Sequence, residues 1–255
     1  MKFKKKTILL TGASTGIGKA ISQKLLQESC NLVLIARRDN LINDYVDKSE
    51  DIIANVKILK CDVSNKLDVE KAYNSAVAEF GNIDIAILNS GVGFNITPET
   101  FESKYAEETM NINFMGVIYW IEQLLPEMIK RKEGIIAPVS SLADNRGYSG
   151  SGFYCASKAA LSTFLEGLSI DLKKHGIKVI TIKPGFVKTP MTDKNKFKMP
   201  FLMSADKSAD IIIKGIEKDK NIIQFPLPTV IGAKLIGLIP SWLYRKIANK
   251  EIMNG

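Results

Sequence analysis

The sequence predicts an α/β fold in which a doubly wound parallel sheet lies between two layers of helices. Short apolar runs alternate with longer stretches of helical spacing along most of the chain, and such alternation is typical of a parallel sheet covered on both faces. A glycine-rich turn joins the first apolar run to the first helical stretch. No internal repeat, low-complexity segment or linker interrupts the 255 residues, so we expect one three-layer domain over residues 1–255.

Strands are expected where the apolar runs are short, and helices where apolar residues recur every three or four positions. The expected strands are Thr7–Leu10, Leu32–Ala36, Val56–Lys60, Ile83–Leu88, Ile135–Val139 and Lys178–Ile182. The expected helices are Gly16–Glu28, Val69–Phe80, a region from about Tyr105 to Lys132 with a break before Met110–Asn113, Phe153–Lys174 and Ala205–Asp219.

The last third of the chain is less regular. Residues 186–203 combine prolines, lysines and methionines without a clean period, which predicts a substrate loop over a site. Residues 220–255 form an apolar tail that carries Trp242, Tyr244, Arg245 and Lys246. Such a tail fits a lid over the active site, a dimer contact or a membrane interface, and all three remain open.

Composition excludes several classes of protein. With 45% hydrophobic and 24% charged residues, the chain resembles an ordinary soluble protein, and no stretch approaches the roughly 20 apolar residues of a membrane span. The net charge of +8 suits anionic ligands or surfaces, but no like-charge block or aromatic-basic patch favours nucleic acid. The three cysteines form no C-x-x-C pair, which suits the cytoplasm. We expect a cytoplasmic protein, with peripheral membrane contact left open.

The segment Thr11–Gly18 has the features of a phosphate-binding turn. Its glycines allow a tight turn and a close approach of the backbone to a pyrophosphate, and the following helix begins with free N–H groups. Because an expected strand precedes it and an expected helix follows it, we interpret the segment as the dinucleotide-binding turn of a Rossmann fold.

The end of the second expected strand bears on the choice between NAD(H) and NADP(H). NAD-binding folds usually place an acidic residue there, but this chain has Ala36 followed by Arg37 and Arg38. A guanidinium binds a 2′-phosphate through charge-assisted hydrogen bonds, whereas a carboxylate repels it. The sequence therefore favours NADP(H) over NAD(H). The competing interpretation is that both arginines are solvated loop charges, and the nearby Asp39 weakens the preference.

Tyr154 and Lys158 stand four residues apart in an expected helix, so their side chains share one face. A neighbouring ammonium favours the phenolate and so lowers the pKa of a tyrosine. This pairing suits Tyr154 to general acid or base chemistry, and a second cation would help to bring its pKa near neutrality. Alone, the spacing also fits a helix in which the tyrosine packs and the lysine is solvated.

In their order along the chain, these motifs resemble those of the short-chain dehydrogenase/reductase family in its short, single-domain form. The resemblance covers about residues 6–191. Beyond the glycine turn and the Tyr154–Lys158 pair, it rests on Asp62–Val63, on Asn89–Ser90–Gly91 where the family usually has Asn-Ala-Gly, on Asn113, on Ser141 thirteen residues before Tyr154, and on Pro184–Gly185 with Val187 and Thr189.

The resemblance implies a catalytic tetrad of Asn113, Ser141, Tyr154 and Lys158, without a metal. Tyr154 would be the general acid or base, Lys158 would also hold the cofactor ribose, Ser141 would orient the substrate oxygen, and Asn113 would stabilise a kink in its helix. The implied cofactor contacts are Gly12, Ser14, Thr15, Gly16, Ile17, Gly18, Arg37, Arg38, Asp62, Val63, Asn89, Ser90, Gly91, Tyr154, Lys158, Pro184, Gly185, Val187 and Thr189.

The predicted function is hydride transfer between nicotinamide C4 of NADP(H) and a carbonyl or alcohol carbon. The apolar residues of the loop 186–203 favour a hydrophobic substrate. Two alternatives are kept: a non-catalytic NADP(H)-binding regulator, and a membrane-associated reductase of lipid-like carbonyls. By resemblance, we expect a homodimer or homotetramer formed through the helices around Asn111–Lys132 and Phe153–Lys174, and no nucleic-acid partner.

Overall fold

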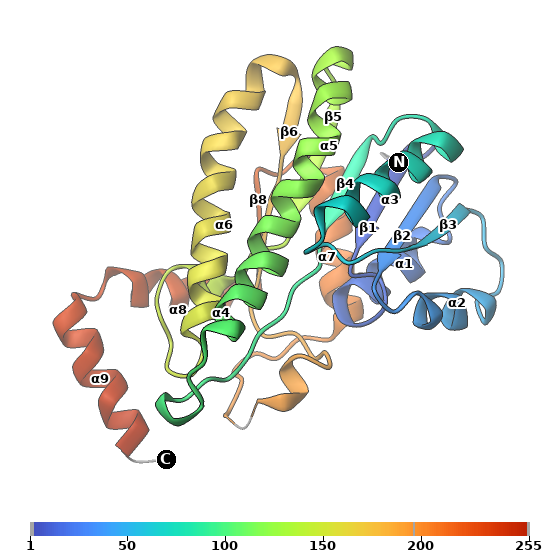
Figure 1. The fold of residues 1–255 in the computed structure, drawn as a ribbon. Coiled ribbons are helices and arrows are strands. Elements are labelled where there is room, and N and C mark those ends of the chain that lie inside the picture. The colour runs from blue at the N-terminus through green and yellow to red at the C-terminus, as the bar shows by residue number, and fades with distance from the viewer. Residues whose placement is uncertain (1–2, 196, 254–255) are drawn as a thin grey trace.

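The computed structural model describes residues 3–195 and 197–253, the last five of these without side chains. A parallel sheet of six strands, in the order β3-β2-β1-β4-β5-β6, lies between two layers of helices (Figure 1). This is the predicted doubly wound fold. The order of the strands reverses between β1 and β4, and sheets of this kind bind ligands at the carboxyl edge of the strands beside such a reversal.

The elements follow the predicted alternation of strands and helices. The strands are β1 (Thr7–Thr11), β2 (Asn31–Ala36), β3 (Asn55–Lys60), β4 (Ile85–Leu88), β5 (Gly134–Pro138), β6 (Ile177–Val179), β7 (Thr181–Pro184) and β8 (Ile222–Phe225). The α-helices are α1 (Gly16–Leu25), α2 (Asp39–Asp47), α3 (Lys66–Phe80), α4 (Ser103–Met110), α5 (Gly116–Arg131), α6 (Gly152–Asp171), α7 (Ala205–Glu217), α8 (Leu227–Leu238) and α9 (Ser241–Met253). Short helical turns are η1 (Pro98–Thr100), η2 (Asn111–Met115), η3 (Leu142–Asp144), η4 (Leu172–His175) and η5 (Thr192–Lys194).

Alternate residues of the central strands supply two hydrophobic cores, one on each face of the sheet. In β1, Ile8 and Leu10 belong to the core that includes residues of α1 and α7, whereas Leu9 belongs to the core that includes residues of α3, α5 and α6. All three side chains are fully buried. Because both faces of β1 are covered, its sequence is apolar along its length, as expected for a parallel sheet.

The structure differs from the predicted elements in several places, and β8, α8 and α9 of the tail were not predicted. Helix α2 was not predicted, because its sequence is mostly polar and only Ile42 and Tyr45 are buried. The strand expected over Lys178–Ile182 is divided at Ile180 into β6, which pairs with β5, and β7, which pairs with β8. The break expected before Met110 is absent, because α4 runs to Met110 and continues through the π-helical turn η2 into α5.

The tail contributes β8, which pairs with β7 in a separate two-stranded sheet, and the helices α8 and α9. Val230 and Ala233 of α8 pack on Leu142, and α9 projects away from the body (Figure 1). The Arg146 guanidinium holds the corner between these helices, since it donates to three carbonyl oxygens near the end of α8 and lies 5.2 Å from the ring of Tyr244. In the described part of the chain, no single helix is long and apolar enough to span a membrane; α8 and most of α9 together reach that length, with a bend of 120° between them.

Candidate active site

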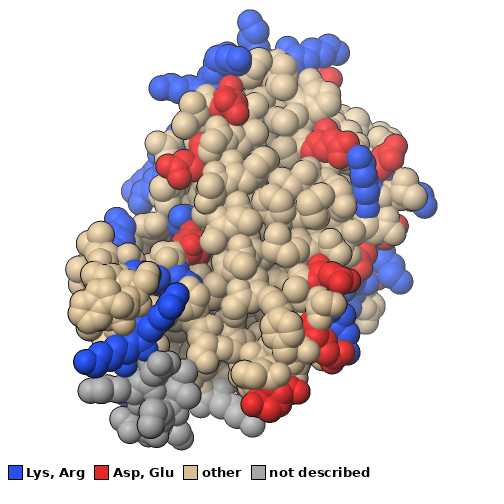
Figure 2. Space-filling view, turned by 60° about the vertical axis from the view of Figure 1, so that its left-hand side comes forward, with Lys and Arg blue, Asp and Glu red and all other residues tan. Residues whose placement is uncertain are grey.

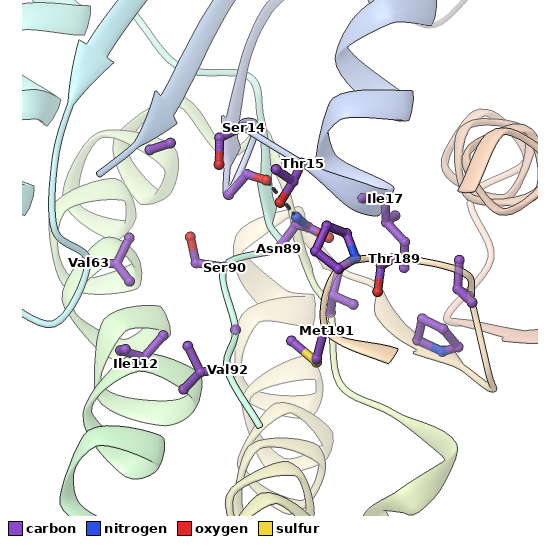
Figure 3. Close-up of a pocket in the computed structure, with 18 of the residues that line it drawn as sticks. Ser14, Thr15, Ile17, Val63, Asn89, Ser90, Val92, Ile112, Thr189 and Met191 are labelled. Carbon is purple, nitrogen blue, oxygen red and sulfur yellow. Dashed lines mark hydrogen bonds between the residues drawn. The ribbon is translucent and has the colours of Figure 1, made fainter. Parts of the chain in front are cut away.

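A cavity along the carboxyl edge of the sheet collects nearly all of the predicted site residues. The ends of β1, β2, β4, β5 and β7 and the loops that follow them form its walls. Figure 3 shows Ser14 and Thr15 at the glycine turn, Val63 and Ile112 on one wall, and Met191 opposite. The predicted residues that line the cavity are Gly12, Ser14, Thr15, Gly16, Ile17, Arg37, Arg38, Asp62, Val63, Asn89, Ser90, Gly91, Ser141, Tyr154, Lys158, Pro184, Gly185, Val187 and Thr189. Two predicted residues, Gly18 and Asn113, do not line it.

The glycine turn has the backbone that dinucleotide binding requires. Gly12 and Gly16 have φ angles of +67° and +59°, a region that favours glycine. A Cβ on Gly18 would lie 2.1 Å from the Gly12 carbonyl oxygen, so Gly18 lets α1 pack closely on the turn instead of contacting a ligand. Thr15 precedes α1 without making a side-chain cap, and the first turn of α1 has no acidic residue. The N–H groups of this turn therefore have no side-chain acceptor, which suits them to bind phosphate.

Asn89 ties the end of β4 to the glycine turn. Its Nδ2 donates to the carbonyl oxygens of Thr11 and Gly12 at 3.2 and 3.3 Å. The backbone N–H groups of Asn89 and Ser90 both donate to the Thr11 hydroxyl, at 3.0 and 3.1 Å. A Cβ on Gly91 would lie 3.3 Å from Asn113 Oδ1 and 3.6 Å from Lys158 Nζ. This motif thus fixes the turn and leaves space beside the expected catalytic residues.

Tyr154, Lys158 and Ser141 meet in the middle of the cavity. Tyr154 and Lys158 share one face of α6, with Lys158 Nζ 5.8 Å from the centre of the Tyr154 ring. Lys158 is buried, and its ammonium donates to the Val139 carbonyl oxygen at 2.7 Å. Ser141 lies just beyond β5 and lines the cavity together with Tyr154, whose pKa it lowers. A hydroxyl, a phenol and an ammonium from two elements therefore converge on one region, as proton transfer to a bound oxygen would require.

Asn113 lies behind these residues in the π-helical turn η2. Its Oδ1 accepts from the Val92 N–H at 2.8 Å, and its Nδ2 donates to the Val92 carbonyl oxygen at 2.9 Å and to Ser157 Oγ at 3.0 Å. The side chain is fully buried. It therefore joins the loop after β4 to α6, and its place in an irregular turn agrees with the kink expected at this residue.

Burial governs the titration of Tyr154 and Lys158. It lowers the pKa of Lys158 to about 8. It also raises the pKa of Tyr154, an effect that the hydrogen bond with Ser141 offsets in part. The lowering expected from the Lys158 ammonium is thus outweighed within the protein itself, because desolvation disfavours the phenolate. A phenolate near neutral pH requires the additional cation that an oxidised nicotinamide would supply.

Arg37 and Arg38 lie at the end of β2, where the sequence predicts the adenosine side of the cofactor site. Arg37 Nη1 lies 3.7 Å from Asp62 Oδ2, and its side chain is 53% exposed. Asp62 Oδ1 in turn accepts from the N–H and the hydroxyl of Ser64, at 3.0 and 2.7 Å. The guanidinium is therefore held at the cavity wall and remains accessible to an anion.

Several residues of the cavity wall were not predicted, and most of them are apolar or small. They are Ala36, Cys61, Val92, Ile112, Val139 and Ser140. Pro190, Met191 and Thr192 also line the cavity, and they belong to the loop 186–203, which was predicted to lie over a site. An apolar residue in a cavity wall looks the same in sequence as a core residue. Their one common signal is adjacency, since nearly all are neighbours of a predicted contact. Among the described residues, no group of three or more His, Cys, Asp and Glu side chains is placed to hold a metal ion.

The doubly wound sheet and the glycine turn define a nucleotide-binding α/β protein, and the residues around the cavity fit a nicotinamide dinucleotide. Comparison with known proteins identifies the class more closely. Residues 6–199 match the short chain dehydrogenase family. The chain therefore belongs to this family and is an NAD(P)-dependent oxidoreductase. This result displaces the non-catalytic regulator that the sequence had left open.

The relatives and solved structures agree with that membership. An uncharacterised oxidoreductase of Myxococcus xanthus is 31% identical over 96% of this chain and 97% of its own length. A fatty acyl-CoA reductase of Acinetobacter baylyi is 31% identical over 84% of this chain and 74% of its own. A short chain dehydrogenase/reductase of Burkholderia phymatum, solved in complex with NAD, has the same fold, with a TM-score of 0.84 at 23% identity over 92% of this chain and 94% of that one.

Proposed function

We propose that the protein is an NADPH-dependent reductase of hydrophobic carbonyl compounds, with Tyr154 as its general acid. The convergence of Tyr154, Ser141 and Lys158 in the cavity carries this proposal. When bound, NADPH supplies a hydride from C4 of its nicotinamide to the carbonyl carbon. Tyr154 gives its phenolic proton to the carbonyl oxygen, and the same residue accepts that proton when the alcohol is oxidised.

The neighbouring residues have supporting roles in this scheme. The Ser141 hydroxyl, which lines the cavity with Tyr154, orients the substrate oxygen beside the phenol. Lys158 stabilises the phenolate that remains after proton transfer and binds the cofactor ribose. Asn113 keeps the loop after β4 against α6 through its contacts with Val92 and Ser157. The apolar wall and the glycine turn position the dinucleotide along the edge of the sheet.

The preference for NADPH rests on Arg37, Arg38 and the lack of an acidic residue at the end of β2. Titrations followed by nicotinamide fluorescence test it directly. We expect Arg37→Ala to raise the Kd for NADPH by about 10- to 100-fold, the worth of a charge-assisted hydrogen bond, and to leave NADH binding nearly unchanged. Lys24→Ala is the matched control, because Lys24 pairs with Asp210 away from the cavity. NADH binding as tightly as NADPH in the unmodified protein would refute the preference.

The preference for hydrophobic substrates rests on the loop that follows β7. Met191 lines the cavity, and Phe197, Phe201 and Leu202 are exposed nearby in sequence, at 52%, 60% and 44%. The names of two relatives, the fatty acyl-CoA reductase above and an 11-beta-hydroxysteroid dehydrogenase-like protein of Arabidopsis thaliana, point the same way. Along a series of straight-chain aldehydes, kcat/KM should rise up to about fourfold per methylene. Faster turnover of small polar ketones than of decanal would sink the hypothesis.

A second candidate is the same reductase working at a membrane surface. Leu235, Leu238 and Trp242 are 60%, 80% and 70% exposed on α8 and α9. The stretch from residue 227 to 248 contains Lys234, Arg245 and Lys246 but no Asp or Glu. Figure 2 shows lysine and arginine side chains beside uncharged surface at its lower left. An apolar helix pair flanked by cations suits an anionic bilayer surface.

Sedimentation with vesicles separates this candidate from a wholly soluble enzyme. The protein should pellet with phosphatidylglycerol vesicles, and the double variant Leu238→Glu, Trp242→Glu should remain in the supernatant. Ile53→Glu, at a position that is 58% exposed on another part of the surface, should pellet like the unmodified protein. Equal sedimentation of all three proteins would show that α8 and α9 do not mediate binding to the vesicles.

We also propose that the protein is a cytoplasmic homodimer or homotetramer. The cytoplasmic assignment is supported by Cys30, Cys61 and Cys155, which are buried free thiols. Assembly through α5 and α6 is supported by Ile170, which is 71% exposed near the end of α6. Light scattering should give a multiple of the 28.2 kDa chain mass, and Ile170→Glu should shift it toward the monomer, whereas Leu67→Glu on α3 should not. A monomeric unmodified protein would overturn the assembly.

A further inference from the structure

Two charged side chains that the mechanism above does not use lie behind the catalytic residues. Asp144, at the end of the η3 turn, and Lys183, in β7, form an ion pair with 2.6 Å between Asp144 Oδ2 and Lys183 Nζ. The side chains are only 10% and 18% exposed. A buried ion pair adds little net stability, because the cost of desolvating both charges offsets their attraction. The pair is therefore better explained by what it holds in place.

The pair joins elements that carry the active site. Ser162, one helical turn after Lys158 in α6, donates a short hydrogen bond to Asp144 Oδ2. Ser162 Oγ also lies 2.8 Å from the hydroxyl of Ser140, the neighbour of Ser141. Ser140 contacts the carbonyl oxygen of Lys158 at 3.1 Å. One polar network therefore links the end of β5 and the η3 turn to the helical face that carries Tyr154 and Lys158.

Lys183 extends the network to the cofactor side of the cavity. It directly precedes Pro184 and Gly185, which line the cavity and are expected to contact the nicotinamide. The Ser140 N–H donates to the Ile182 carbonyl oxygen at 2.7 Å, so β7 is also joined to the end of β5 through the backbone. A shift of either charged side chain would therefore displace both the face of α6 that carries Tyr154 and the Pro184–Gly185 segment.

The Asp144 carboxylate also acts on Tyr154 itself. Desolvation, Cys155 and the Asp144 carboxylate raise the pKa of Tyr154, and the hydrogen bond with Ser141 lowers it. The Lys158 ammonium lies 5.8 Å from the ring centre, and the loop after β4 presents the uncharged Gly93, whose added Cβ would lie 3.3 Å from the ring. Asp144 is therefore the one carboxylate among these groups that acts on Tyr154. Lys183 is the cation that pairs with Asp144.

We propose that Asp144 and Lys183 form a positioning pair that holds the Tyr154 face of α6 against Ser141 and the Pro184–Gly185 segment, and that balances charge around the phenol. The proposal rests on the proposed role of Tyr154. Neither residue touches the reacting atoms in this scheme. Both act through Ser162, Ser140 and the backbone of β7.

The decisive experiment measures the titration of Tyr154 by NMR of protein labelled at tyrosine Cζ, with Tyr154→Phe to assign the signal. This readout requires neither cofactor nor substrate, so failure of the proposed function would not obscure it. Asp144→Asn should lower the pKa of Tyr154 by about one unit. Lys183→Gln, which leaves the Asp144 carboxylate without its cation, should raise it by about one unit, the scale of one charge acting through a partly polar medium. In the double variant, the pKa of Tyr154 should lie within about half a unit of its value in the unmodified protein.

Opposite shifts distinguish this role from a purely structural one. If the pair only supported the fold, both single variants would move Tyr154 in the same direction or not at all, and that outcome would overturn the proposal. Lys183→Arg should titrate like the unmodified protein and covers the case in which Lys183→Gln fails to fold. Asp84→Asn is the control, because Asp84 forms a comparably buried pair with Arg131, 3.2 Å away and 20% exposed, beside β4 at the opposite edge of the sheet.

A second readout uses catalysis, with NADPH and decanal as the probe. Asp144→Asn and Lys183→Gln should each lower kcat by about tenfold or more, and Lys183→Arg should restore it to within about threefold. Unchanged kcat in the two single variants would contradict positioning. If the unmodified enzyme does not reduce decanal, the proposed substrate class fails, and the titration above still decides the role of the pair.

Discussion

At the scale of one residue, Lys158 is a buried charge whose desolvation lowers the stability of the folded protein. Its side chain is 3% exposed, and its ammonium has one carbonyl acceptor, the Val139 oxygen. Burial lowers the pKa of this ammonium from 10.5 to about 8. At about 1.4 kcal/mol per pKa unit, holding the cation costs the folded state about 3 kcal/mol at neutral pH. Such a cost is typical of a site whose charge serves the reaction.

Replacement of Lys158 by methionine should therefore stabilise the protein while abolishing turnover. At pH 7 the free energy of unfolding should rise by about 1 to 3 kcal/mol, less than the full cost because the Val139 carbonyl loses its donor. In the unmodified protein the folded state loses its Lys158 proton near pH 8 and the unfolded state near 10.5. Stability should therefore increase between these pH values.

Urea unfolding of the Lys158→Met variant from pH 7 to 10 checks this expectation. The gain in stability should shrink as the pH rises, because Lys158 of the unmodified protein loses its proton and its charge above about pH 8. Lys173→Met, at an exposed position of η4, should change stability by less than about 0.5 kcal/mol. A Lys158→Met variant that is less stable than the unmodified protein at pH 7 would show that burial of the ammonium is not costly.

Gly18 illustrates a second single-residue constraint, in which the backbone leaves no space for a side chain. Gly18→Ala should lower the free energy of unfolding by about 3 kcal/mol and weaken NADPH binding, since the added Cβ would lie 2.1 Å from the Gly12 carbonyl oxygen. Gly152→Ala is the matched control, because a Cβ there has no neighbour within 4 Å and alanine suits the start of α6. Thermal unfolding of both variants measures the difference, and equal Tm values would mean that α1 can move away from the turn.

At the scale of elements, the sequence predicts regular strands and helices, but it does not predict where a strand changes its pairing partner in the sheet. The strand β1 and the helix α6 could be predicted because burial on two faces and helical spacing leave plain patterns. The division at Ile180 could not, because the sequence stays apolar while the pairing partner changes from β5 to β8. Helix α2 buries only Ile42 and Tyr45, too few to leave a clear period.

The candidate site divides in the same way. The glycine turn and the Tyr154–Lys158 pair could be predicted because their chemistry depends on spacing within one segment. Val92 and Ile112 could not, since an apolar side chain in a cavity wall has no signal of its own. The Asp144–Lys183 pair was also out of reach, because distant segments meet there only after the sheet has formed.

Helix α3 allows a test of how an element is fixed by its first residue. Asn65 caps this helix, and its Oδ1 accepts from the backbone N–H groups of Leu67 and Asp68 at 3.0 and 3.3 Å. Asn65→Ala should lower the free energy of unfolding by about 1 kcal/mol, and Asn65→Asp should retain most of it. Denaturant unfolding monitored by circular dichroism measures both. Equal losses in the two variants would show that the cap contributes nothing through its oxygen.

At the scale of the whole molecule, the fold brings to one edge of the sheet the residues that we propose for cofactor binding, proton transfer and substrate selection. The glycine turn and the arginines lie at the ends of β1 and β2, the Tyr154 cluster lies beside the end of β5, and the loop 186–203 follows β7. The net charge of +8 favours the approach of an anionic dinucleotide to this edge. The helices α8 and α9 lie beyond the lower end of α6 in the view of Figure 1.

The most direct measurement compares the unmodified protein with Tyr154→Phe in NADPH binding and in NADPH-dependent reduction of decanal. The variant should bind NADPH within about threefold of the unmodified protein, because the ring and Lys158 remain, and its kcat should fall at least about 100-fold, the usual worth of a general acid. Retained turnover by Tyr154→Phe, with NADPH binding intact, would contradict the assignment of Tyr154 as the proton donor.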